Sequence, residues 1–205
     1  MADVRVLVVR TGVANLASVL TGLKRAGAKA ELCIDPEAIG SARAVVLPGV
    51  GAFGAGMKSL RKTGMVQALK SRIEQRLPTL AVCLGLQLLC ASSRESPGET
   101  GLGIIDLPVG RFTDKVRVPQ LGWNKVEPEP GCKLLEEGYA FFANSFRLDR
   151  APDNWNAAYS DYDGPFAAAL ESGPVLACQF HPELSGSWGR ALIRRWLKCA
   201  GGRPC

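Results

Sequence analysis

The chain has 205 residues, of which 47% are hydrophobic, and 25 basic against 19 acidic residues give it a formal net charge of +6. This length and apolar content suit one globular domain with a sizeable core, and no apolar run approaches the roughly 18–20 residues of a membrane span. The basic residues are dispersed rather than set in a dense stripe with aromatics, which argues against nucleic-acid binding. We therefore expect one domain over residues 1–205, with no membrane and no nucleic acid among its partners.

The first part of the chain alternates short apolar runs with amphipathic segments. Val4–Val9, Ala28–Ile34 and Ala44–Leu47 each predict a buried strand. Between the first two, Asn15 is a suitable cap for a helix that Gly27 would end. Strands separated by helices predict a parallel, doubly wound sheet, in which ligands bind beyond the carboxyl ends of the strands.

The loop Pro48–Gly54 follows the third predicted strand and permits three interpretations. Its Gly-x-Gly-x-x-Gly spacing matches dinucleotide-binding loops, so a nicotinamide or flavin oxidoreductase is the rival hypothesis. That fingerprint normally follows the first strand and requires an acidic residue about 20 positions later. Here the nearest candidate is Glu74, in a predicted surface helix. We favour an oxyanion hole, because glycines let backbone N–H groups turn toward a developing negative charge. A purely structural tight turn is the third interpretation.

Cys83 stands at the junction of a strand and a helix. Leu80–Val82 predict the end of a buried strand, and Leu84–Ala91 predict a helix that begins immediately afterwards. A cysteine on such a sharp turn projects its sulfur out of the sheet, and Gly85 leaves room for the backbone to turn tightly. The helix N-terminus favours a thiolate and a nearby oxyanion. The alternative is an inert core cysteine.

From Arg111 onward, short alternating runs predict antiparallel strands, and Leu102–Ile105 before them predicts an edge strand. The predicted antiparallel strands include Lys115–Pro119 and Trp123–Val126. Four later runs are expected to continue or rejoin the sheet: Tyr139–Ala143, Asn156–Tyr159, Phe166–Leu170 and Val175–Gln179. Trp188–Leu197 predicts a closing helix. The predicted class is α/β, with a single doubly wound, mostly parallel, flavodoxin-like sheet that has an antiparallel extension.

The only histidine of the chain, His181, also follows a predicted strand. A thiol nucleophile requires a base, and the imidazole requires a third group that fixes its tautomer. Glu183 would reach the ring if the segment is extended through Pro182. A lone histidine is more often structural, but the adjacent acid and the position at a strand end favour catalysis. We therefore predict Cys83, His181 and Glu183 as catalytic residues.

Two motifs carry a family resemblance. Val82-Cys83-Leu84-Gly85-Leu86-Gln87 together with Phe180-His181-Pro182-Glu183 resembles the signature pair of the class I, triad-type glutamine amidotransferases. In that family the cysteine attacks the side-chain amide of L-glutamine, releases ammonia and leaves a thioester that water hydrolyses. The resemblance implies an oxyanion hole at Val50, Gly51 and Leu84, with the Gly51 amide turned by a peptide flip.

The residues that bind substrate and the residues that contact a partner are predicted less directly. We expect Gly49 and Gln87 to bind the substrate, although Gln87 is otherwise an ordinary polar helix residue. Asn15 either contacts a partner or only caps its helix. Trp123 is either a core side chain or an interface anchor. Glu95 has no assigned role and is expected to be solvated.

Three further stretches resemble the glutaminase subunits of imidazole glycerol phosphate synthases. They are Gly12–Val19, Pro119–Asn124 and Ala143–Phe146. The resemblance implies a (β/α)₈-barrel cyclase as the heterodimer partner, ammonia transfer to it, and a place in histidine biosynthesis. The segment Pro119–Asn124 argues against a glutaminase for the pyridoxal phosphate or anthranilate systems. Many relatives carry histidine where Gln120 and Asn144 stand. A non-catalytic regulatory module is a further alternative, which the intact triad disfavours.

The cysteines and the N-terminus bear on the compartment. Seven cysteines are scattered without a CxxC pair, and Met1–Arg5 enters a strand without a signal-peptide pattern. With one histidine, a structural zinc site is not expected. We expect reduced thiols, no cofactor and a cytoplasmic location.

Overall fold

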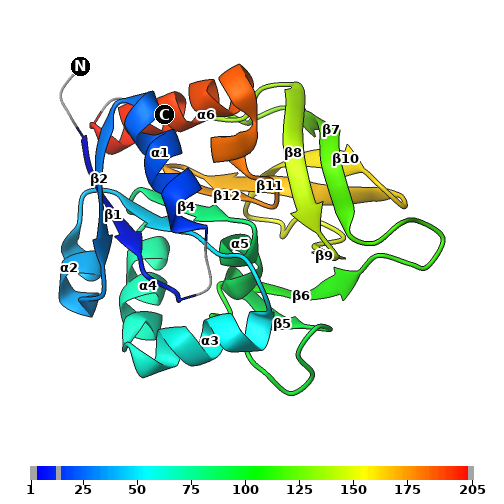
Figure 1. Cartoon of the computed structure of the whole chain (residues 1–205), viewed down its shortest axis with the longest axis horizontal. Coiled ribbons are helices and arrows are strands. Elements are labelled where there is room, and N and C mark those ends of the chain that lie inside the picture. Colours follow the sequence, from blue (N-terminus) through cyan, green and yellow to red (C-terminus); the bar gives the residue numbers. More distant parts are fainter. Residues whose placement is uncertain (1–3, 13–14, 203–205) are drawn as a thin grey trace.

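The computed structural model describes residues 4–12 and 15–202, which form a nine-stranded sheet between two layers of helices (Figure 1). Half of this sheet is parallel, and its strand order is the flavodoxin-like 2-1-3-4-5 arrangement. In spatial order these strands are β2 (Ala28–Cys33), β1 (Val4–Val9), β3 (Val45–Leu47), β4 (Thr79–Val82) and β12 (Val175–Cys178).

The other half of the nine-stranded sheet is antiparallel and continues from β12. In spatial order its strands are β11 (Pro165–Ser172), β10 (Asn156–Asp161), β7 (Gln120–Pro128) and β8 (Gly138–Asn144). A separate three-stranded sheet lies below it in Figure 1. This small sheet is made of β5 (Cys90–Ser93), β6 (Ile105–Arg111) and β9 (Phe146–Arg147).

Helices cover both faces of the parallel strands, as the alternation of buried side chains along β1 requires. Val6 and Val8 belong to one hydrophobic cluster and Leu7 and Val9 to the other. The first cluster includes side chains of α1 (Leu16–Ala26) and α6 (Gly186–Ala200). The second includes side chains of α2 (Pro36–Ser41), α3 (Phe53–Lys62), α4 (Met65–Glu74) and α5 (Leu84–Leu89).

Most of the predicted elements are confirmed, including the α/β class, the flavodoxin-like parallel part and its antiparallel extension. Asn15 caps α1 by accepting a hydrogen bond from the Ser18 amide, and Gly27 ends the helix in a left-handed conformation. The expectation of a single sheet is wrong, because the small sheet was not predicted. The calls on Met1–Arg5 and on Gly12–Val19 partly fall on Met1–Asp3, Val13 and Ala14, which lie outside the described residues.

Three element predictions are wrong in detail. The helix after Cys83 ends at Leu89 instead of reaching Ala91, because β5 begins at the next residue, Cys90. The edge strand starts only at Ile105, so Leu102–Ile104 lies outside it. Lys115–Pro119 forms neither strand nor helix, because its alternating residues find no neighbouring strand to pair with.

The cysteines do not all behave alike. Cys33, Cys83, Cys90, Cys132 and Cys178 are free thiols, whereas Cys199 is disulfide-bonded, so the expectation of reduced thiols is wrong at that position. Among the helices within residues 4–12 and 15–202, none combines the length and apolar character that crossing a membrane requires.

Candidate active site

Cys83 occupies the sharp turn between β4 and α5 in a strained conformation. Its φ of 53° and ψ of −111° fall in a region that L-residues rarely adopt. Its main-chain amide donates to the Cys178 carbonyl at 2.7 Å, which fixes the end of β4 against β12. A Cβ on Gly85 would lie 2.1 Å from the Leu47 carbonyl oxygen, so the turn is sterically possible only with glycine there.

His181 reaches Cys83 because β12 and β4 are parallel neighbours. Cys178 pairs with Val82, so both strands end at the same edge of the sheet. Beyond β12, the His181 amide donates to the Phe141 carbonyl of β8 at 2.9 Å. The histidine then leads into a short 3₁₀ helix, η1 (Pro182–Leu184), which turns Glu183 back toward the imidazole.

The imidazole of His181 contacts the side chains of both Cys83 and Glu183. Its Nδ1 lies 2.9 Å from Glu183 Oε1, and these two side chains are only 6% and 5% exposed. Burial lowers the pKa of His181, but the hydrogen bonds with Cys83 and Glu183 outweigh burial and raise it from 6.5 to about 10. The ring is therefore protonated at neutral pH. The structure thus brings together the three side chains predicted as catalytic.

A cavity of about 410 Å³ opens in front of Cys83 and His181. Four more of the predicted site residues, Val50, Gly51, Leu84 and Gln87, line it. The predicted substrate-binding residue Gly49 does not line the cavity but packs against Leu84, where a Cβ on Gly49 would lie 2.8 Å from the Leu84 Cβ. The remaining lining residues are Ala52, Glu95, Ala143, Asn144, Ser145 and Phe146. The cavity is large enough for an amino acid.

The proposed oxyanion donors are not all free. The Leu84 amide donates to the Gly49 carbonyl at 3.3 Å. Gly51 has a φ of 99°, a conformation available to glycine at little cost. An amide already bonded to a carbonyl does not receive a substrate oxyanion until that carbonyl turns away. In this conformation of the loop, the Leu84 amide, one of the predicted oxyanion donors, is already occupied by the Gly49 carbonyl.

Glu95 is a site residue that the sequence analysis missed, and the expectation that it is solvated is wrong. Its carboxylate accepts from the Phe53 amide at 2.6 Å, and the neighbouring Ser96 hydroxyl accepts from the Gly54 amide at 3.0 Å. Ala52, at the start of α3, supplies no side-chain cap of its own. These two contacts therefore cap α3 from a segment 42 residues away and anchor the end of the loop beside Cys83.

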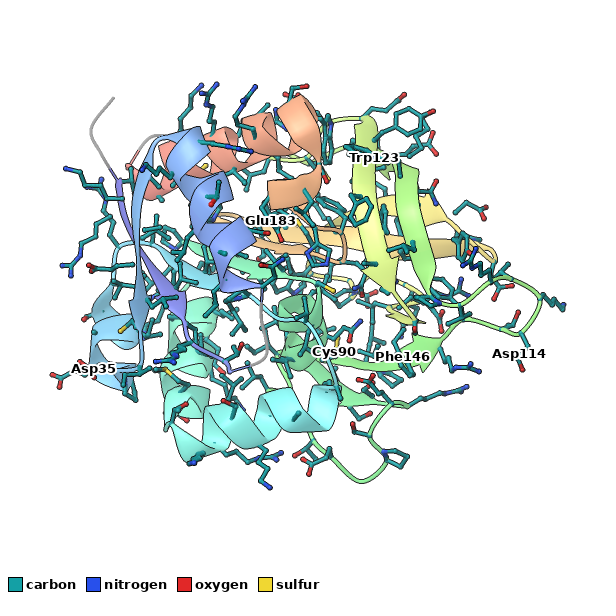
Figure 2. The ribbon with its side chains drawn as sticks, in the orientation of Figure 1. Asp35, Cys90, Asp114, Trp123, Phe146 and Glu183 are labelled. Atoms are coloured by element: carbon teal, nitrogen blue, oxygen red, sulfur yellow. The ribbon has the colours of Figure 1, made fainter. Side chains whose placement is uncertain are left out.

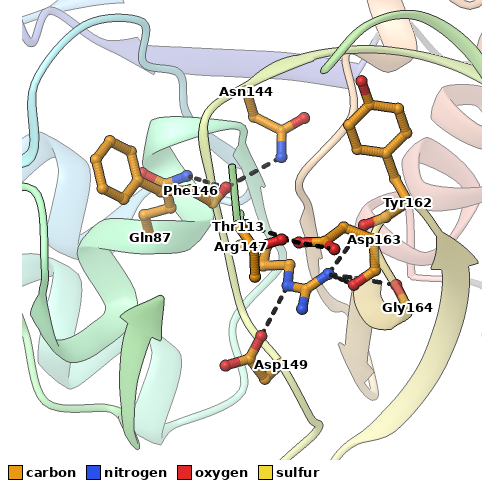
Figure 3. Close-up of polar contacts among 9 residues, drawn as sticks. All are labelled: Gln87, Thr113, Asn144, Phe146, Arg147, Asp149, Tyr162, Asp163 and Gly164. Atoms are coloured by element: carbon orange, nitrogen blue, oxygen red, sulfur yellow. Dashed lines mark hydrogen bonds and ion pairs between the residues drawn. The ribbon is translucent and has the colours of Figure 1, made fainter. Parts of the chain in front are cut away.

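Phe146 lines the cavity, and hydrogen bonds to its main-chain carbonyl fix its position (Figure 3). The side-chain amides of Gln87 and Asn144 both donate to this oxygen, at 3.2 and 3.0 Å. Next to it, Arg147 donates from Nη1 to three main-chain carbonyls and from Nε to Asp149. The three carbonyls belong to Tyr162, Asp163 and Gly164. This network fixes β9 and so the cavity wall.

The two predicted interface residues lie outside the cavity. Trp123 is 57% exposed on β7 and packs edge-to-face on Phe141, with ring centroids 6.3 Å apart (Figure 2). Leu121 and Tyr139 are exposed on the same two strands. Asn15 is exposed and makes the cap contact described above. The described residues contain no group of three or more His, Cys, Asp or Glu side chains able to hold a metal ion.

Comparison with known proteins adds the family context. The family described as glutamine amidotransferase class-I matches residues 14–198. The imidazole glycerol phosphate synthase subunit HisH of Symbiobacterium thermophilum is 36% identical over 196 residues, covering 94% of this chain and 92% of that protein. The same-named subunit of Escherichia coli is 37% identical over 198 residues, covering 94% and 98%. A crystal structure titled as a glutamine amidotransferase has a similar fold, with a TM-score of 0.76, 22% identity and coverage of 95% and 98%.

Proposed function

The chain belongs to the class I glutamine amidotransferases, and we propose that Cys83, His181 and Glu183 are the catalytic triad with which it hydrolyses L-glutamine. One observation carries this proposal: the only histidine of the chain makes side-chain hydrogen bonds to the cysteine on one side and to the glutamate on the other. Thiol, base and orienting acid are the three parts that nucleophilic catalysis requires. The whole chain, residues 1–205, acts as one glutamine amidotransferase domain in this proposal.

In the proposed reaction, the Cys83 sulfur attacks the side-chain amide carbon of glutamine and forms a C–S bond. The His181 imidazolium gives its proton to the leaving nitrogen, the C–N bond breaks and ammonia departs. His181 then takes a proton from water, which attacks the thioester carbon. The C–S bond breaks, glutamate leaves and the thiolate is restored. Glu183 keeps the ring in the tautomer and orientation that both proton transfers need.

Substrate contacts follow from the cavity. Gln87 lines it one turn into α5 and is placed to bind the amino-acid end of glutamine, whereas Gly49 would act on the substrate through Leu84, against which it packs. Val50, Gly51 and Leu84 would surround the oxyanion that forms on the amide oxygen when the sulfur attacks its carbon. Because the Leu84 amide is bonded to the Gly49 carbonyl, we propose that this loop must rearrange before hydrolysis is fast.

The two relatives described above are named as a subunit of imidazole glycerol phosphate synthase. We therefore propose that this chain is the glutaminase subunit of such a synthase in cytoplasmic histidine biosynthesis, passing ammonia to a (β/α)₈-barrel cyclase. The exposed apolar side chains of Leu121, Trp123 and Tyr139 support a partner-binding face on β7 and β8, since exposed Trp and Tyr are typical anchors of interfaces. Asn15, which is exposed, is a further proposed contact with the partner.

The proposal is tested by measuring glutamine hydrolysis by the purified chain alone, and then with a cyclase partner and its nucleotide substrate. We expect slow hydrolysis alone and a large increase in the complex. Fast hydrolysis by the isolated chain would contradict the requirement for a loop rearrangement. Absence of hydrolysis in both states, with Cys83 intact, would contradict the assignment to this synthase.

The variant Cys83→Ala tests the division of roles between triad and partner face. It should reduce hydrolysis by at least about 10⁴-fold, because the nucleophile is lost. Its affinity for the cyclase should change little, because Cys83 is buried and is not one of the exposed side chains of the proposed partner face. Partner binding is measured by calorimetric titration, and equal loss of both properties would argue against separate roles.

A further inference from the structure

Gln179 is a buried polar residue whose side chain touches the sulfur of Cys83. It follows β12 directly, is fully buried, and its main-chain amide donates to the Ala168 carbonyl at 2.8 Å. Its side-chain Nε2 lies 3.6 Å from Cys83 Sγ, within hydrogen-bonding distance for sulfur. Cys83 therefore has two polar neighbours, the His181 imidazole and an amide that cannot titrate.

A chain of hydrogen bonds determines which end of the Gln179 amide faces the sulfur. The Phe146 main-chain carbonyl can only accept, so Gln87 must present its Nε2 to it, at 3.2 Å. The same nitrogen donates its second hydrogen to Gln179 Oε1 at 3.0 Å. With its oxygen used in this way, Gln179 has its Nε2–H group toward Cys83. The opposite orientation would place one donor against another at Gln87 and an acceptor against the sulfur.

We propose that Gln179 is a positioning residue that holds Cys83 as a thiolate aimed into the cavity. The inference rests on the proposed role of Cys83 as the nucleophile. A hydrogen bond from a neutral amide stabilises the anion without offering a proton that moves to it, so His181 alone exchanges protons with the reaction. Because Gln87 lines the cavity and also orients Gln179, the substrate-binding wall and the nucleophile are joined through two buried amides.

The test measures the rate at which iodoacetamide alkylates Cys83 as a function of pH, with the modified peptide quantified by mass spectrometry. Gln179→Met keeps the length of the side chain and removes the donor. It should move the midpoint of the profile upward by about one pH unit, the size expected when a charged group loses a hydrogen bond. Below the midpoint, the alkylation rate should then fall about tenfold.

Two further variants keep the experiment decisive. Gln179→Glu retains the acceptor for Gln87 but puts an acidic oxygen beside the sulfur. It should therefore raise the midpoint of the alkylation profile at least as much as Gln179→Met. If Gln179→Met does not fold, Gln179→Glu provides the test. Gln120→Met makes the same change at a buried glutamine on β7 that is not part of the cavity wall, and should leave the midpoint unshifted.

The outcomes separate this inference from the proposed function. An unshifted midpoint in folded Gln179→Met and Gln179→Glu would overturn the role of Gln179, while Cys83 could still be the nucleophile. Glutamine hydrolysis that survives Cys83→Ala would overturn the proposed function instead. Alkylation itself needs no glutamine turnover, so it reports on Cys83 in either case.

Discussion

His181 is held between two partners of different chemistry, a thiol and a carboxylate. The carboxylate fixes one ring nitrogen at 2.9 Å, and the thiol bonds to the same ring. Both neighbours favour the charged ring, and their combined effect exceeds the cost of burying it. The buried thiol of Cys90 shows the contrary case, since burial alone raises its pKa to about 12 and leaves it protonated. The two cysteines therefore lie in chemically different surroundings, one beside an imidazole and the other in the apolar core.

The protonation of His181 can be observed directly, because it is the only histidine of the chain. In protein prepared without a histidine tag, the imidazole resonances should titrate with a midpoint near pH 10. Glu183→Gln removes the carboxylate that raises the pKa and should move this midpoint to lower pH. Nuclear magnetic resonance between pH 5 and 10.5 measures both midpoints. A midpoint near 6.5 in the unsubstituted protein would contradict the proposed charge state.

The same shift predicts how stability depends on pH. A histidine whose pKa is raised on folding stabilises the protein fully below its unfolded value of 6.5, and this contribution is lost as pH rises through about 10. The difference in unfolding free energy between the unsubstituted protein and Glu183→Gln should therefore shrink as pH rises across this range. Urea denaturation at several pH values measures this difference in unfolding free energy. A difference that grows as pH rises would contradict the prediction.

Among the structural elements, the turn from β4 to α5 depends on the close approach of two backbones. A Cβ at Gly85 would meet the main-chain oxygen of Leu47 at 2.1 Å, and no side-chain rotation relieves that contact. Gly85→Ala should therefore lower the unfolding free energy by about 1–3 kcal/mol through overpacking and displace Cys83. Urea denaturation measures the loss of unfolding free energy, and the rate of glutamine hydrolysis reports the displacement of Cys83.

The helix glycine Gly40 provides the matched control for Gly85. A Cβ there would lie 4.0 Å from the Ala68 Cβ, an ordinary contact, and Gly40 lies within α2. Gly40→Ala should be neutral or stabilise the protein by up to about 1 kcal/mol, because alanine loses less entropy in a helix. Similar losses of unfolding free energy in Gly85→Ala and Gly40→Ala would show that the close approach at Gly85 does not make an added Cβ more destabilising.

Elements that depend on local pattern could be predicted from the sequence, and elements that depend on distant partners could not. Asn15 and Gly27 mark the ends of α1 within the helix itself. By contrast, Cys90 and Ala91 continue the apolar helical pattern, but Cys90–Ser93 forms β5 because Ile105–Arg111 lies beside it. The contact between His181 and Glu183 was predictable because the two residues are neighbours in one motif, whereas Glu95 and Gln179 contact groups 42 and 96 residues away.

Across the whole molecule, the two halves of the nine-stranded sheet have different roles in the proposed enzyme. The parallel half ends at the edge that carries Cys83 and His181. The antiparallel half presents exposed apolar side chains on β7 and β8, and β8 also receives the His181 amide through Phe141. A partner that binds β7 and β8 would therefore contact the strand to which the main chain of His181 is hydrogen-bonded. This arrangement gives a short physical route from partner binding to the active site.

Trp123 should be the main anchor of that partner face. Truncating a large, well-placed aromatic at an interface typically costs 2 kcal/mol or more, so Trp123→Ala should weaken binding of the cyclase by about 30-fold or more. The concentration of cyclase needed for half-maximal stimulation of hydrolysis measures this. The matched control is Leu32→Ala, which removes a 42% exposed apolar side chain from β2, the edge strand farthest from β8. Because a partner on β7 and β8 does not reach that edge, Leu32→Ala should leave the half-maximal concentration unchanged. Equal weakening by both variants would place the partner elsewhere.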